Sequence, residues 1–128
     1  MDSKNNKQEL IQKEPLLPPI VEEYYDLCRW ILAKVSKFQK DQKYILGTRM
    51  QNCTMDVLEL IIDAALSERA KKEPFLINAI QKLEHIRYHL RLSVHAQMMT
   101  PRSYAYASKK IIGIGQKLGA WNKSVRDA

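Results

Sequence analysis

Residues 46–65 read LGTRMQNCTMDVLELIIDAA, and this stretch decides the fold. Its apolar residues recur at intervals of three and four, the spacing that places them on one face of an α-helix. The stripe comprises Leu46, Met50, Cys53, Val57, Leu60, Ile61 and Ala64. We therefore predict an amphipathic helix from about Gln42 to Arg69.

Three further stripes have the same period. The first ends before the polar residues 39–43, and the next follows Pro74, which fits the first position of a helix because its missing N–H needs no partner there. The last follows Thr100 and Pro101, an N-cap and a first-turn proline. The three stripes comprise Ile20, Tyr24, Leu27, Cys28, Ile31, Val35 and Phe38; Leu76, Ile80, Leu83, Ile86, Leu90 and Val94; and Tyr104, Ala107, Ser108, Ile111, Ile114, Gly115, Leu118 and Val125.

Four amphipathic helices joined by short connections predict an all-α protein, an up-down-up-down four-helix bundle over residues 20–128. No stretch alternates as a β-strand does. Residues 1–19 are expected to form a polar N-terminal tail and a proline-rich lead-in. Within this tail Met1–Glu14 is expected to be mobile or only loosely docked.

The two cysteines, Cys28 and Cys53, fall on the apolar stripes and are interpreted as core residues rather than as a disulfide or part of a metal site. The polar N-terminus predicts no signal peptide, and no apolar run approaches the roughly 18 residues that span a bilayer. These features predict a cytoplasmic protein with no membrane partner.

The net charge of +7 is concentrated in the predicted bundle. The tail carries as many acidic as basic residues, whereas no acidic residue occurs between Glu84 and Asp127. This asymmetry favours a polyanion as partner. A solvated face that only keeps the protein soluble would have the same composition.

No catalytic or metal-binding constellation has convincing spacing. His85 and His89 are an i,i+4 pair, but His85 points away from the apolar stripe and no cysteine or carboxylate accompanies the pair, so both are expected to be exposed. Arg91 and His95 are similar to the arginine–histidine signature of the helical HEPN ribonucleases, yet too few residues intervene for a match. We predict that the protein is not an enzyme and holds no metal or cofactor.

Two sets of basic residues are candidate binding sites. Arg87 projects close to the third apolar stripe, where either Glu84 holds it as an i,i+3 ion pair or Arg87 and Arg91 form a surface for phosphates. A second cluster, or an ordinary solvated face, comprises Lys34, Lys37, Lys40 and Lys43. Tyrosines among these charges, Tyr44 and Tyr88, either stack on bases or lie at the edge of the core.

Three of the four glycines, Gly113, Gly115 and Gly119, lie inside the last predicted helix, where each costs about 1 kcal/mol relative to alanine. We expect the close approach of another backbone, from this chain or from another subunit, to compensate. The candidates for helix packing or oligomer contacts are Gly115, Gly119 and Trp121.

Several short motifs in order resemble a known family, the accessory variability determinant proteins of diversity-generating retroelements. Related four-helix proteins are encoded in bacterial large-subunit rRNA intervening sequences. The resemblance covers most of the chain beyond residue 20, and the NCTMDVLELIIDAA stretch is closer to the retroelement branch. The motifs are Tyr44, Leu46-Gly47, Arg49, Leu58-Glu59 and Ala65; Arg87 and Leu90-Arg91; Met99-Thr100-Pro101; and Gly115, Leu118-Gly119 and Trp121.

The resemblance implies a protomer of a homopentameric barrel that does no chemistry itself. It would bind a reverse transcriptase and the template-repeat RNA, with DNA as a further partner, and support mutagenic cDNA synthesis. Arg49, Arg87 and Arg91 match arginines of the family, which implies contact with RNA or with the polymerase. The four lysines are assigned by charge alone.

Two other functions stay open. The first is an oligomeric four-helix scaffold of the intervening-sequence type, in which the basic surface has no nucleic-acid role. The second is an RNA-cleaving enzyme of the helical ribonuclease kind that depends on His95.

Overall fold

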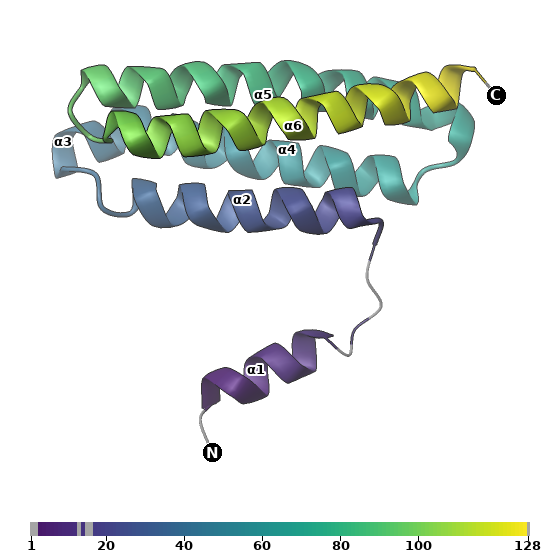
Figure 1. Ribbon diagram of the computed structural model, residues 1–128, viewed down its shortest axis with the longest axis horizontal. Coiled ribbons are helices and arrows are strands. Elements are labelled where there is room, and N and C mark those ends of the chain that lie inside the picture. Colours follow the sequence, from purple (N-terminus) through teal and green to yellow (C-terminus); the bar gives the residue numbers. More distant parts are fainter. Residues whose placement is uncertain (1–2, 13, 15–16, 128) are drawn as a thin grey trace.

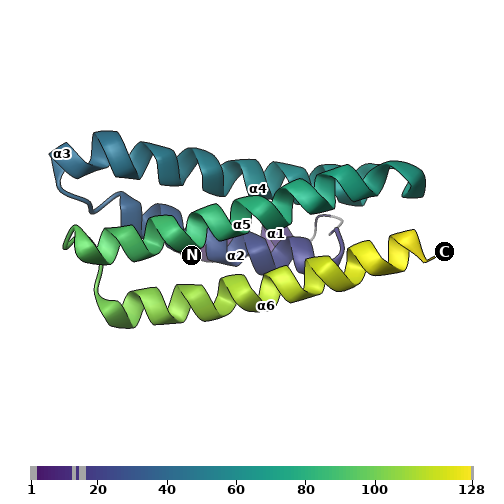
Figure 2. The same ribbon diagram turned by 90° about the horizontal axis from the view of Figure 1, so that it is seen from above.

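The computed structural model describes residues 3–12, 14 and 17–127, and every regular element within these ranges is helical. Four long helices run up and down beside one another (Figure 1). In the bundle α2 contacts α4 and α6, and α5 contacts the same two helices (Figure 2). The predicted all-α class and bundle are confirmed. The four helices are α2 (Pro19–Val35), α4 (Thr48–Leu66), α5 (Lys72–His95) and α6 (Pro101–Arg126).

The core lies between these four helices and consists mainly of the predicted stripes. Stripe residues such as Ile31, Ile61 and Ile111 are fully buried, and both cysteines are buried and unpaired as expected. Some predicted members lie at the edge and are only half-buried: Ile20, Leu60, Ile80, Val94, Tyr104, Gly115 and Val125. Other buried residues were not predicted because they are polar or small: Thr54, Ala79, Ser93 and Asn122.

The connection between the first two bundle helices differs from the prediction. Helix α2 ends at Val35, so Phe38 is buried from the turn rather than from the helix. The next helix begins earlier than Gln42 and ends before Arg69, because Ser67 is extended. It comprises α3 (Lys40–Gln42), a π-helical turn η1 (Lys43–Gly47) and then α4.

The π-helical turn brings Gly47 against the end of α2. A Cβ atom added to Gly47 would lie 3.1 Å from Cγ1 of Val35, which is tighter than nearly all real contacts of this kind. The backbone of Gly47 is in the ordinary helical region, so the requirement for glycine comes from space. A π-turn adds one residue to a helical turn, which a period of 3.6 residues cannot reveal.

Replacing Gly47 with alanine is expected to lower the free energy of unfolding by about 1 kcal/mol, because crowding against Val35 outweighs the gain in helix propensity. Urea denaturation measures this change. The matched control is Gly113→Ala on α6, where an added Cβ meets nothing within 4 Å and a gain of about 1 kcal/mol is expected. Equal stabilisation by the two alanines would contradict the crowding at Gly47.

The starts of the last two helices, α5 and α6, can also be compared with the prediction. Helix α5 begins at Lys72 after a 3-10 turn, η2 (Arg69–Lys71), so Pro74 is its third residue rather than its first. The position is still tolerated because the first N–H groups of a helix have no partner. The α6 start is confirmed, since Thr100 Oγ1 accepts a hydrogen bond from the Ser103 N–H at 3.1 Å and Pro101 is the first helical residue.

The N-terminal tail contains a fifth helix that the sequence did not predict, α1 (Ser3–Gln12). It lies away from the bundle (Figure 1), and its apolar residues Leu10 and Ile11 are exposed. The tail residues 1, 2, 13, 15 and 16, with Ala128, fall outside the described residues.

The glycines of α6 are not compensated as expected within the chain. Added Cβ atoms at Gly113 and Gly119 meet nothing within 4 Å, and one at Gly115 makes only an ordinary contact with Leu83 at 3.9 Å. Within the part of the chain that the structure describes, no other helix therefore approaches their backbone closely. None of the described helices has both the length and the apolarity to cross a membrane.

Candidate nucleic-acid interface

The positive charge of the bundle is gathered at one end. Residues 34–49 and 87–110, which we call the basic end, carry ten basic residues and one acidic residue, Asp41. The remainder of residues 17–127 carries eight basic and ten acidic residues. Both segments of the basic end lie where α2 ends and α6 begins (Figure 1). The fold therefore combines charges that are far apart in the sequence.

These charges are largely unneutralised. Among the described residues, Arg87 is the only basic residue of the basic end with a carboxylate within 4.0 Å. The other ion pairs lie outside it and join Lys82 to Asp56, Lys117 to Glu23 and Arg126 to Glu73. A surface of like charges without counter-charges raises the local concentration of anions.

Arg87 forms the ion pair with Glu84 that was one of its two predicted roles. Nη2 of Arg87 lies 2.7 Å from Oε2 of Glu84, and Nε donates to Oε1 at 3.2 Å. This bidentate hydrogen bond raises the pKa of Arg87 and lowers that of Glu84. Arg87 and Arg91 both lie over the ring of Tyr88, at 5.1 and 5.7 Å from its centroid. The Tyr88 side chain is exposed, not at the core edge.

The four lysines are divided between two grooves. Lys34 and Lys37 line a hollow of about 540 Å³ beside the loop that joins α5 to α6. Lys40 and Lys43 line another of about 380 Å³, together with the exposed Tyr44. All four lysines belong to the basic end.

An aromatic pair at the basic end was not predicted. Trp30 of α2 and Tyr106 of α6 lie 5.2 Å apart between ring centroids. Nζ of Lys34 lies 5.2 Å from the Trp30 centroid, and Nζ of Lys110 lies 5.7 Å from that of Tyr106. Each aromatic residue and its lysine are spaced i,i+4, so their contact could have been predicted from the sequence. The contact between the two aromatic rings could not, because it depends on how α2 packs against α6.

Arg49 lies apart from Arg87 and Arg91. It lines a groove of about 480 Å³ between α4 and α5, whose lining includes His85 and His89 but neither of the other two arginines. His85 is exposed as predicted, but the prediction for His89 is wrong, because its ring is half-buried. Burial, and then the charges of His85 and Arg49, lower the pKa of His89.

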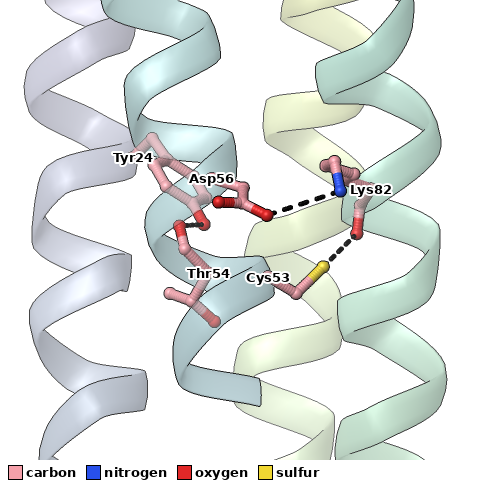
Figure 3. A network of polar contacts seen from close by, with 5 residues as sticks. All are labelled: Tyr24, Cys53, Thr54, Asp56 and Lys82. Atoms are coloured by element: carbon pink, nitrogen blue, oxygen red, sulfur yellow. Dashed lines mark hydrogen bonds and ion pairs between the residues drawn. The ribbon is translucent and has the colours of Figure 1, made fainter. Parts of the chain in front are cut away.

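Polar contacts join α4 to α2 and to α5 near this groove, and Cys53, Asp56 and Lys82 of this network line it (Figure 3). The Tyr24 hydroxyl of α2 donates to the Thr54 carbonyl of α4 at 2.7 Å. Lys82 of α5 pairs with Asp56 at 3.5 Å, and the Cys53 thiol donates to the Lys82 carbonyl at 3.6 Å. Burial raises the pKa of the Cys53 thiol, so it is a structural group rather than a nucleophile.

Metal binding has no support in the described part of the chain. No group of three or more histidine, cysteine or carboxylate side chains there is placed to hold an ion. This includes the α4–α5 groove, although Cys53 and Asp56 line it beside the two histidines.

Comparison with known protein families gives one match that spans the bundle. The sequence model of the bAvd-like family matches residues 19–125. The chain belongs to the bAvd-like family. These are bacterial accessory variability determinants, the accessory and non-catalytic proteins of diversity-generating retroelements. No curated protein matches the chain significantly.

Proposed function

We propose that this bAvd-like protein is a non-enzymatic subunit that binds RNA, and also DNA, together with a reverse transcriptase during mutagenic cDNA synthesis. The observation that carries the proposal is the basic end, where nine of ten basic residues have no carboxylate partner among the described residues. Contacts to phosphates release condensed counterions and need no base-specific groups. The proposal requires no cofactor.

The alternative is an oligomeric scaffold whose basic surface has no ligand. Salt distinguishes the two, because each phosphate contact contributes about 0.7 to the slope of log affinity against log salt for a single strand. Binding through the basic end therefore weakens steeply as salt rises. A scaffold would show little RNA binding at any salt concentration.

The two tryptophans provide a test of where RNA binds. Trp30 lies beside the basic end, whereas Trp121 lies near the far end of α6 with Lys72 over its ring at 5.8 Å. In a Trp121→Phe variant we expect RNA at low salt to change the Trp30 emission, and added salt to reverse the change. In the matched Trp30→Phe variant the Trp121 emission should stay constant. A larger response from Trp121 would place the RNA elsewhere.

For the reverse transcriptase we propose the surface formed by Tyr88, Arg87 and Arg91. Tyrosine and arginine dominate the binding energy of many protein interfaces, and Tyr88 is 55% exposed with two guanidinium groups within 6 Å of its ring centroid.

Replacing Tyr88 with alanine should weaken the complex with the reverse transcriptase about tenfold, because an anchor of this kind contributes at least about 1–2 kcal/mol. The equilibrium affinity for the purified enzyme measures the effect. The control is Tyr25→Ala, a comparable site at which Arg29 lies 6.0 Å from an exposed tyrosine ring. An equal loss in both variants would exclude this surface as the docking site.

We also propose that the chain forms a homopentamer in which α6 packs against another subunit. Two features support this arrangement: the open space at Gly119, where an added Cβ would meet no atom of the described residues within 4 Å, and the exposed Ile112 on the same helix. Glycine in a helix is destabilising unless a close contact uses the space.

A further inference from the structure

The groove between α4 and α5 has the features of a ligand site outside the lysine grooves. It is an open hollow of about 480 Å³. The π-helical turn η1 forms one rim with Tyr44 and Ile45, which are 71% and 72% exposed. Such π-turns occur frequently at functional sites because they displace side chains from the regular helical pattern. The remaining lining residues are Thr48, Arg49, Asn52, Cys53, Asp56, Lys82, His85 and His89.

The two cationic side chains that line this groove, Arg49 and Lys82, outnumber its single carboxylate. Asp56 is the one carboxylate in the lining, and Lys82 pairs with it at 3.5 Å. Arg49 is exposed and has no carboxylate within 4.0 Å among the described residues. An arginine has five donors in a planar fork that suits the oxygens of a phosphate.

His89 supplies a donor that faces the same space. Its Nδ1 is enclosed and has no hydrogen-bond partner among the described residues, and the residue lines the groove. We assign the proton of the neutral ring to Nε2, because an N–H on the enclosed Nδ1 would have no acceptor among the described residues. The lowered pKa of His89 keeps this neutral form at pH 7. His89 therefore presents an N–H to the groove.

We propose that this groove binds a phosphoryl group of a nucleic acid through the Arg49 guanidinium and the His89 Nε2–H, with His85 at its rim. The assignment of nucleic acid as the source rests on the proposed function. The phosphoryl group belongs either to a terminal phosphate or to a backbone phosphodiester. The exposed Tyr44 provides a surface on which the adjoining base can stack.

The test follows the His89 ring signals by NMR in the full chain. The ligands are inorganic phosphate and short oligouridylates with and without a 5′-phosphate. Arg49→Gln is expected to weaken phosphate binding about tenfold, as for the loss of a hydrogen bond to a charged group. The phosphate affinity of Arg49→Lys should lie between those of Arg49→Gln and the original chain. The matched control is Arg29→Gln, which removes an exposed arginine of α2 outside both the basic end and this groove and should change the affinity less than about twofold.

Bound phosphate should also raise the pKa of His89, because its charge opposes those of Arg49 and His85. A preference for the 5′-phosphorylated strand would identify a terminal phosphate, and equal binding of both strands would identify a phosphodiester. Equal losses in Arg49→Gln and Arg29→Gln, or unshifted His89 signals while RNA binds, would overturn this site and leave the proposed function intact. Shifts with inorganic phosphate but no RNA binding would support the site and contradict the proposed function.

Discussion

Replacing Lys37, Lys40 and Lys43 together with glutamine should lower the affinity for single-stranded RNA roughly 50-fold at 0.15 M salt. Three phosphate contacts, each contributing about 0.7 to the salt slope, give a factor of this size. All three lysines are exposed in the basic end, and none has a carboxylate partner among the described residues. Fluorescence anisotropy across a salt series measures both the affinity and the slope, which should fall by about 2.

The matched control removes the same charge from the rest of the bundle. Lys71, Lys117 and Lys123 are also exposed, but they lie outside the basic end. Their replacement with glutamine should change the affinity only a few-fold, through the general loss of positive charge. If the two triple variants lost affinity equally, binding would follow net charge and the basic end would have no special role.

The four-helix bundle could be predicted from the sequence because it depends on the helical spacing of apolar residues. The ends of the helices were harder to predict where they depend on contacts between residues that are distant in the sequence. Gly47 is crowded by Val35, twelve residues away, and the π-helical turn that ends at Gly47 leaves the surrounding stripe intact. The buried Ser93 was missed because its polarity gives no hint that its hydroxyl can donate to the His89 carbonyl within the same helix.

The sequence predicted the charge of the candidate site but not the arrangement of its side chains. Helix projection placed Arg87 within reach of Glu84, and the ion pair is present. Projection of a single helix could not show that Arg49 and His89 line the same groove, because this depends on how α4 and α5 pack. The pairing of Trp30 with Tyr106 was hidden for the same reason.

Replacing Gly119 with leucine should convert the proposed homopentamer into single chains. An added Cβ at Gly119 meets nothing within 4 Å in the chain, so the bundle should keep its helical content. In an assembly that packs another subunit against Gly119, the leucine would occupy the space of the neighbouring backbone. Sedimentation velocity measures the loss of the larger species, and circular dichroism verifies the fold.

Gly113→Leu is the control for this substitution. An added Cβ at Gly113 also meets no described atom within 4 Å, but the six intervening steps place Gly113 roughly 120° away from Gly119 around the helix axis. We expect this variant to retain the assembly. Loss of the assembly in both variants would implicate the whole of α6 rather than the face that carries Gly119, and retention in both would remove that face from the interface.

The most direct test of the account is the mass of the native particle by light scattering, with and without a structured RNA, at low and at moderate salt. We predict a particle of about five chains that gains the mass of the RNA at low salt and loses it at moderate salt. A monomer or dimer whose mass is indifferent to RNA would contradict both the assembly and the nucleic-acid role.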